Sequence, residues 1–148
     1  AKNAGVEATM LGGDGWDGIL GVLDPSNYSA VEGIYFNNHY STESTDEKLQ
    51  AFLASYKSTY GSDATPFAAL GYDTVYMVKQ AVETAFEGVD KPDFYDSAKI
   101  TEALKNITYA GITGTIKFDE NRNPVKTVSI TTIKDGAYKF VETYSLEG

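Results

Sequence analysis

The chain has 148 residues and a formal net charge of −9, with 12 Lys and Arg against 21 Asp and Glu. This length and an ordinary globular composition suit one domain, and the charge argues against nucleic acid as a partner, because phosphate contacts require clustered Lys and Arg. The lack of cysteine excludes disulfide scaffolds, thiolate zinc sites and cysteine nucleophiles. No run of residues is apolar over the roughly 18 positions that a membrane-spanning helix needs.

The first part of the chain is predicted to hold two strands and a short helix. Residues 1–5 are typical of the end of a helix, because Gly5 is a common C-cap. We therefore expect the chain to be a fragment of a longer protein. The predicted elements that follow are a strand over 6–11, a glycine-rich turn at 12–15, a short helix over 16–22 and a strand over 31–36.

The middle of the chain is predicted to be helical. Ser44 and Glu47 form a capping box, which is followed by one apolar face that runs from Leu49 to Tyr60 and ends at Gly61.

Two more helices are predicted after that one. Thr65 and Pro66 suit the N-cap and the first position of the second helix, which Gly88 is expected to stop. Ser97 is expected to cap the third helix. The apolar set of the second helix is Phe67, Leu70, Val75, Val78, Val82, Ala85 and Phe86.

Beyond Gly111 the apolar residues alternate with period two, which predicts strands. We expect them over 114–118, 125–133 and 137–144, with Asp135 and Gly136 as a hairpin turn between the last two. The resulting order, β-α-β-α-α-α-β-β-β, indicates an α/β fold in which helices are layered on a sheet.

Residues 13–18 (GDGWDG) match the glycine spacing of a dinucleotide-binding turn between a strand and a helix. The chemistry argues against a nucleotide, because Asp14 would repel a pyrophosphate on the helix N-terminus and Trp16 is bulky where backbone must approach the ligand. Two interpretations remain. The turn is either a tight connection that needs glycine dihedrals, or a display of Asp14 at the carboxyl end of a strand, where open α/β sheets bind small molecules.

Asp119, Asn121 and Asn123 are spaced like the start of a calcium-binding loop. Pro124 stands where that loop needs glycine, and Ile130 stands where it needs a bidentate glutamate. A polar turn between two strands is the better interpretation.

Catalytic chemistry has little support in the sequence. His39 is the only histidine, and its neighbours are poor partners for a metal site or a triad, which favours a solvated or hydrogen-bonded side chain. Asp14 and Asp17 could serve a hydrolase, but their spacing does not set the separation that such chemistry demands. We expect no catalytic residue, no metal and no cofactor.

The chain resembles the carboxyl-terminal part of the extracytoplasmic solute receptors of ABC importers, in the leucine/isoleucine/valine-binding family. The resemblance covers nearly all residues and is carried by the order of six segments: LGGDGWDG, VEGIYFNNHY, a helix with Phe-x-x-x-Tyr-x-x-x-Tyr-Gly (residues 52–61), PFAALGYDTVYMVKQAVETA, ITEALKNITYAGITGTIKFDENRNPVK and VSITTIKDGAYKFV. It implies part of a two-lobe type I periplasmic-binding fold, a Rossmann-like three-layer α/β/α architecture, with a C-terminal β-hairpin. Arg122 and Asn123 stand where the family usually has Gly-Asp.

The resemblance also implies how the chain is divided. Residues 1–38 and 127–148 would belong to the second, C-terminal lobe and residues 39–126 to the first, N-terminal lobe, while the family's amino-terminal half is absent. Domain swapping or a homodimer could then complete the open sheet edges.

The site residues implied by the resemblance are Asp14, Phe67 and Trp16. Asp14 would receive the α-ammonium of the ligand, Phe67 would wall the side-chain pocket, and Trp16 would line the cleft. The groups that clamp the α-carboxylate would lie in the absent half. The ligand therefore stays open, since relatives also bind amides and aromatic acids.

The implied function is capture of an amino acid, branched-chain or otherwise apolar, for delivery to a membrane permease. Such a bacterial receptor would carry a secretion signal in its precursor and work in the periplasm or as a cell-surface lipoprotein. Two alternatives remain open. One is the ectodomain of a sensor with the same fold, and the other is a hydrolase that uses Asp14 and Asp17.

Overall fold

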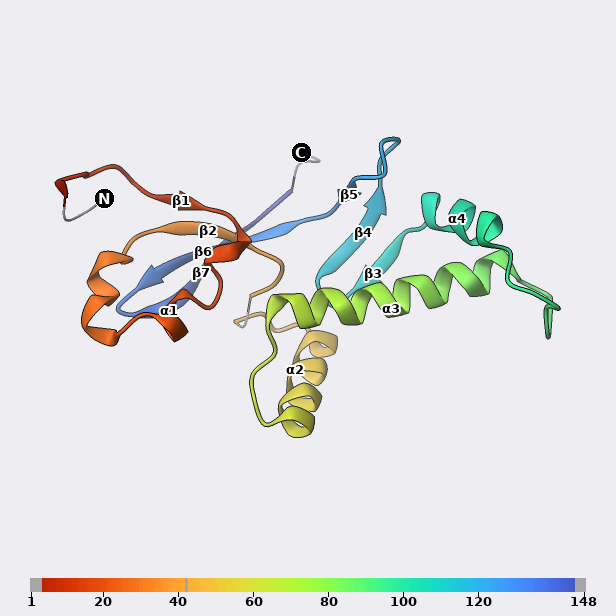
Figure 1. The fold of residues 1–148 in the computed structure, drawn as a ribbon, viewed down its shortest axis with the longest axis horizontal. Coiled ribbons are helices and arrows are strands. Elements are labelled where there is room, and N and C mark those ends of the chain that lie inside the picture. Colours follow the sequence, from red (N-terminus) through yellow and green to blue (C-terminus); the bar gives the residue numbers. More distant parts are fainter. Residues whose placement is uncertain (1–3, 42, 146–148) are drawn as a thin grey trace. The chain divides into compact units, whose positions relative to one another are not determined.

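The computed structural model describes residues 4–41 and 43–145. These residues form two compact units, one made of 4–41, 43–45 and 128–145, the other of 46–127 (Figure 1). The assignment of chain segments to the two lobes of a receptor stays a prediction. The helix end predicted at residues 1–5 lies mostly outside the described residues, and Gly5 has the left-handed φ of 76° that a C-cap glycine needs.

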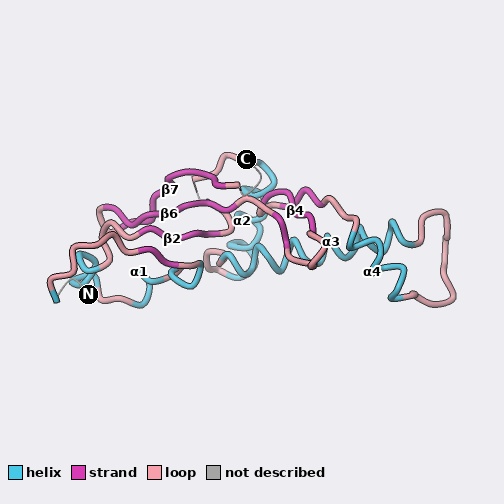
Figure 2. Tube along the Cα trace, turned by 90° about the horizontal axis from the view of Figure 1, so that it is seen from above, coloured by secondary structure: helices cyan, strands magenta, loops and turns pink. Residues whose placement is uncertain are grey.

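The first unit is built on a four-stranded sheet. Figure 2 shows β2, β6 and β7 side by side. The strand order is β1-β2-β6-β7, with β1 parallel to β2 and the other neighbours antiparallel. The strands are β1 (Leu11–Gly12), β2 (Tyr35–Asn38), β6 (Val128–Lys134) and β7 (Ala137–Tyr144).

The core of this unit consists of Val31, Ile34, Phe36 and Ile133. The strand predicted over 6–11 shrinks to β1, because only Leu11 and Gly12 pair with β2. β2 starts later than predicted, since residues 31–33 form a turn. β2 comes before the second unit in the sequence and β6 comes after it. The two strands pair with each other, with Asn38 opposite Ser129.

The helix predicted over 16–22 is broken in two. The 3₁₀ helix η2 covers Asp14–Trp16 and α1 covers Ile19–Val22, separated by Gly18 in the left-handed conformation with a φ of 81°. A second 3₁₀ helix, η3, covers Pro25–Ala30.

The hairpin turn between β6 and β7 is confirmed. Asp135 and Gly136 have φ angles of 54° and 69°, as a type I′ turn requires. The carboxylate of Glu32 accepts hydrogen bonds from both backbone N–H groups, at 2.7 Å and 3.4 Å, and so fixes the turn to the preceding segment.

The second unit combines three helices with a three-stranded antiparallel sheet of order β3-β4-β5. In Figure 1, α3 runs beside β3 and α4. The elements are α2 (Glu47–Tyr60), α3 (Pro66–Ala85), α4 (Ser97–Lys105), β3 (Tyr109–Gly111), β4 (Gly114–Phe118) and β5 (Pro124–Val125).

Helix ends follow local rules, with two corrections. Gly61 ends α2 with a φ of 72°, and Thr65 caps α3 as predicted. The predicted caps Ser44 and Ser97 are wrong, because an aspartate directly precedes each helix. Asp46 accepts the N–H of Leu49, and Asp96 accepts that of Ala98.

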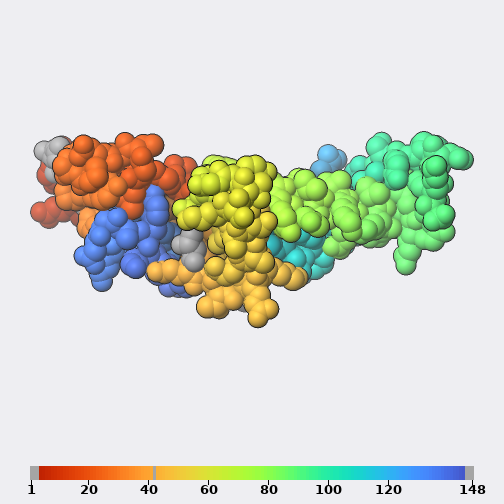
Figure 3. All heavy atoms as spheres, turned by 90° about the horizontal axis from the view of Figure 1, so that it is seen from below, coloured from red at the N-terminus to blue at the C-terminus, as the bar shows by residue number. Residues whose placement is uncertain are grey.

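The buried side chains of α3 are not those of its apolar set. Its buried side chains include Ala69, Asp73 and Ala81, whereas Val75 is 68% exposed and Val78 is also exposed. Small residues let β3 and α4 approach the helix closely, so its larger apolar side chains turn outward. In Figure 3, α3 forms part of the visible surface, coloured yellow to light green.

The single strand predicted over 125–133 is two strands, β5 in the second unit and β6 in the first, because 126–127 connect the units. Within the described residues, no helix combines the length and apolar character needed to cross a bilayer.

Candidate functional site

Asp14 lies two residues after the end of β1, at the first position of η2. Its Oδ2 atom is 3.0 Å from Nε2 of His39, the residue that follows β2. The Asp14 side chain is 42% exposed and the His39 side chain 17%. The carboxylate of Asp14 is therefore oriented by His39 yet remains open to solvent, which suits a charge-assisted hydrogen bond from a cationic group such as an ammonium group.

A second carboxylate, that of Asp17, is close to the same histidine. Asn38 donates from Nδ2 to Oδ1 of Asp17 at 2.8 Å, and its own Oδ1 accepts the backbone N–H of His39 at 2.7 Å. Burial raises the pKa of Asp17, while the Asn38 hydrogen bond and the nearby His39 act in the opposite direction. Asn38 thus ties the end of β2 to the glycine turn.

His39 is hydrogen-bonded, as the sequence predicted, but the identity of its partner was missed. β1 and β2 are parallel neighbours, so the residues that follow them meet at one edge of the sheet. That rule places His39 beside Asp14 once the two strands are known to be parallel neighbours, which the sequence pattern does not show. Nδ1 of His39 is buried and has no hydrogen-bond partner within residues 4–41 and 43–145.

Trp16 is partly buried against the core of the first unit. A Cβ atom on Gly12 would overlap the indole ring, so the ring lies directly on the backbone of β1. These contacts give Trp16 a structural role. Its part in lining a ligand cleft stays a prediction.

Phe67 lies in the first turn of α3, in the second unit, and is 63% exposed. It is not a core side chain of that unit. Its predicted role as the wall of a side-chain pocket stays a prediction.

Asp73 is a buried charged residue that sequence reasoning missed. It is 1% exposed, and its carboxylate accepts the N–H groups of Ile112 and Thr113, each at 2.8 Å, and the hydroxyl of Thr113 at 2.6 Å. A Cβ on Gly111 would come within 2.6 Å of the carboxylate. Asp73 therefore fastens the β3–β4 turn to α3, which is a structural function.

Lys126 extends this network. Its ammonium group donates to the hydroxyl of Thr113 at 2.9 Å. Burial lowers the pKa of Lys126, and the charge of Asp73 counteracts part of that shift.

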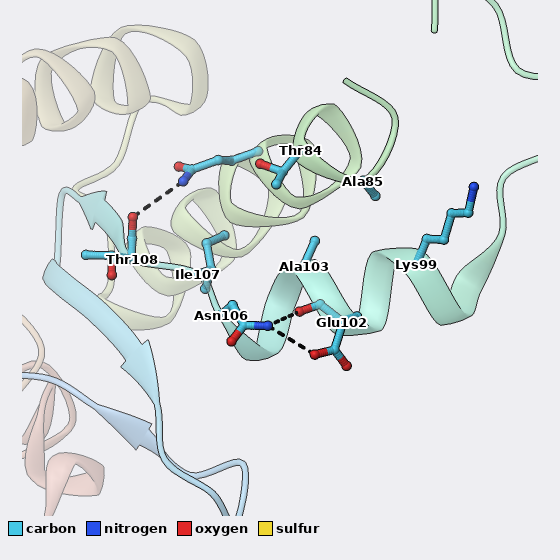
Figure 4. A pocket seen from close by; sticks show the side chains of 9 residues that line it. Thr84, Ala85, Lys99, Glu102, Ala103, Asn106, Ile107 and Thr108 are labelled. Atoms are coloured by element: carbon cyan, nitrogen blue, oxygen red, sulfur yellow. Dashed lines mark hydrogen bonds between the residues drawn. The ribbon is translucent and has the colours of Figure 1, made fainter. Parts of the chain in front are cut away.

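An open groove of about 440 Å³ lies between α3 and α4 (Figure 4). Four of its polar residues bond one another in pairs. Nδ2 of Asn106 donates to both the backbone and the side chain of Glu102, and Gln80 donates to the carbonyl of Thr108. Because these pairs already use four of its polar residues, we do not consider this open groove a binding site.

A second groove, of about 510 Å³, lies along α2 and α3. Its aromatic side chains pack against one another with tilted rings, whose centroids are 4.9 Å apart for Phe52 and Tyr72 and 4.6 Å apart for Tyr72 and Tyr76. This contact joins the two helices and is an element of packing.

Metal binding finds no support in the part of the chain that the structure describes, where no cluster of three His, Asp or Glu side chains occurs. The Asp119 carboxylate accepts hydrogen bonds from the backbone N–H groups of Asn121 and Asn123, which confirms the polar turn. Arg122 takes a φ of 68° in this turn, in the place of the glycine that the resembled pattern has.

Comparison with known proteins gives consistent matches. Residues 1–137 match the family described as periplasmic binding protein. A leucine-binding protein from Thermotoga maritima of known structure is 29% identical, with a TM-score of 0.73 over 99% of this chain and 40% of that one. A branched-chain amino acid transporter substrate-binding protein from Streptococcus pneumoniae, solved with isoleucine, is 30% identical, with a TM-score of 0.68 over 95% of this chain and 39% of that one.

Another relative is described as a receptor-like protein and not as a transport protein. The metabotropic glutamate receptor-like protein E of Dictyostelium discoideum is 26% identical over 113 residues, which are 76% of this chain and 14% of that protein. The chain thus spans about 40% of the length of the solved relatives and a smaller part of the curated one.

Proposed function

Because the chain belongs to the periplasmic binding protein family, we propose that it is part of an extracytoplasmic receptor that captures an amino acid for an ABC importer. The chain has part of the type I periplasmic-binding fold, an α/β fold, in agreement with the sequence. Two solved relatives are described as leucine-binding and as bound to isoleucine, which supports a branched-chain or other apolar amino acid as the ligand.

The observation that carries this proposal is the position of Asp14. It follows a strand of an α/β sheet, is flanked on both sides by glycine and keeps nearly half of its side chain exposed. A carboxylate there can accept charge-assisted hydrogen bonds from the ligand's α-ammonium group, each worth about 1.5–3 kcal/mol once water is excluded.

The mechanism is binding without chemistry. In a two-lobe receptor, a ligand that contacts both lobes favours their closed arrangement, and the closed form docks on the membrane permease. Phe67 would then wall the side-chain pocket. The receptor would act in the periplasm or as a cell-surface lipoprotein.

The test is calorimetric titration with leucine of the receptor that carries both lobes, as wild type and as Asp14→Asn. The substitution keeps the size of the side chain but removes its charge, so we expect binding to weaken roughly ten- to a hundredfold. Asp135→Asn is the matched control, because Asp135 is exposed in the hairpin turn at the far end of β6 from Ser129, the partner of Asn38. Asn also tolerates its positive φ.

Asp17→Asn is not a neutral control, since Asp17 is partly buried and holds Asn38. Equal losses for Asp14→Asn and Asp135→Asn would indicate general electrostatic attraction. Unchanged leucine binding in Asp14→Asn would refute the assignment of Asp14 as the anchor.

A second candidate function is the ligand-binding ectodomain of a sensor, and the Dictyostelium relative, described as receptor-like, favours it. The two functions differ in their partner. A receptor for import raises uptake of radiolabelled leucine when it is combined with its permease in vesicles, whereas a sensor ectodomain leaves uptake unchanged.

A further inference from the structure

We propose that His39 makes ligand binding at Asp14 dependent on pH, because its imidazolium form competes with the ligand's ammonium group for the same carboxylate. This inference rests on the proposed function, in which Asp14 is the anchor. It assigns a role to the only histidine of the chain.

The geometry favours a neutral imidazole when the ligand is bound. With the proton on Nε2, His39 donates to Oδ2 of Asp14 across 3.0 Å and orients the carboxylate. A carboxylate can accept about four hydrogen bonds, so a partly exposed Asp14 keeps capacity for an ammonium group. Neutral His39 is therefore a positioning residue that leaves the charge of Asp14 intact.

Protonation changes this balance. The second proton would go to Nδ1, which is buried and has no acceptor among residues 4–41 and 43–145. The charged ring would then form a full ion pair with Asp14 and offset the negative charge that attracts the ligand. Proton and ligand thus oppose each other through one carboxylate.

The charged groups that face His39 come from the glycine turn. Among residues 4–41 and 43–145, Asp14 and Asp17 are the charged groups seen to interact with it, and the preceding residue, Asn38, is uncharged. With neutral His39, the negative charge of Asp14 is available to an incoming ammonium group, and with imidazolium that charge is offset. Protonation of Asp17 at low pH would act in the same direction, so the experiment must separate the two groups.

The expected effect follows from linkage. Imidazole side chains change charge between about pH 5 and pH 8, and a competing cation disfavours ligand binding on the acidic side. We expect the affinity for leucine to be about tenfold lower near pH 5.5 than near pH 8, which corresponds to about 1.4 kcal/mol.

The test measures leucine affinity by calorimetry near pH 5.5 and near pH 8 for the two-lobe receptor, as wild type, His39→Gln and Asp17→Asn. Glutamine can still donate to Asp14 but does not titrate, so the ratio of the two affinities should fall to about twofold or less. In Asp17→Asn the ratio should persist. Circular dichroism checks that each variant is folded.

A second measurement needs no variant. Since this chain contributes one histidine, the ring signals of His39 can be followed by NMR in the receptor, and saturating leucine should move their titration midpoint to lower pH. An unmoved midpoint would overturn the inference.

The outcomes separate this inference from the proposed function. Leucine binding with the same pH profile in wild type and His39→Gln would overturn the role of His39 and leave Asp14 as anchor. A profile that disappears only in Asp17→Asn would assign the effect to Asp17 and also overturn it. Absence of leucine binding near pH 8 would refute the proposed function, and the inference with it.

Discussion

Replacing Asp73 by Asn should unfasten the β3–β4 turn from α3 and destabilise the second unit. The Asp73 carboxylate accepts three hydrogen bonds of 2.6–2.8 Å from Ile112 and Thr113. An asparagine offers one oxygen in place of two, and its amide group would face backbone N–H donors. At least one donor would remain buried without an acceptor.

The magnitude can be built from these contacts. Hydrogen bonds to a charged group contribute about 1.5–3 kcal/mol each, and leaving a buried donor unsatisfied costs about 1–3 kcal/mol more. We therefore expect Asp73→Asn to lower the free energy of unfolding by about 3–5 kcal/mol. This is a large fraction of the roughly 5–15 kcal/mol that holds a typical domain folded.

Two measurements check this prediction. Urea unfolding followed by far-UV circular dichroism gives the stability, whereas fluorescence does not, because the single tryptophan, Trp16, lies in the first unit. Hydrogen exchange of the Ile112 and Thr113 amides reports the turn directly. Asp93→Asn, a matched change in the exposed loop between α3 and α4, is the control. A loss below about 1 kcal/mol with unchanged exchange at both amides would refute the role of Asp73.

Three further outcomes are expected. Gly111→Ala should also destabilise the turn, because the added Cβ would come within 2.6 Å of the Asp73 carboxylate, and the same urea titration measures it. Burial, followed by the charge of Asp73, raises the pKa of Tyr109 from 10.0 to about 12. A neutral Tyr109 therefore stabilises the folded state below pH 10, and this contribution is lost as the pH rises to about 12. Alkaline unfolding should be less steep in Tyr109→Phe, and equal curves would contradict the shift. Phe67→Ala should change which amino acids bind while costing far less stability than the roughly 3–5 kcal/mol of a core phenylalanine, as a thermal-shift ligand screen can show.

Local sequence signals predicted helix ends and turns correctly where one or two residues determine the backbone conformation. Gly61 after a helix, Thr65 before one, and Asp135 with Gly136 between two strands each act through their own dihedrals or capping bonds. The caps at Asp46 and Asp96 follow the same rule, but a nearby serine offered a competing signal.

The sequence pattern did not reveal contacts between residues that are far apart in the chain. The buried face of α3 is set by Asp73, whose partners lie near residue 112, so an apolar stripe could not reveal it. In the candidate site, Asp14 could be selected from its glycine turn, whereas its pairing with His39 depends on which strands are neighbours. Periodicity identifies strands but does not fix their order.

The pairing of β2 with β6 has a consequence for how the chain folds during synthesis. Asn38 is synthesised long before Ser129, so the central strand pair of the first unit can form only after Ser129 has left the ribosome. Closing so long a loop carries an entropic cost that slows folding. Prior folding of residues 46–127 would shorten the flexible loop and lower this cost. Of the two units, the one formed by residues 46–127 can therefore fold before the other, whose sheet needs residues on both sides of it in the sequence.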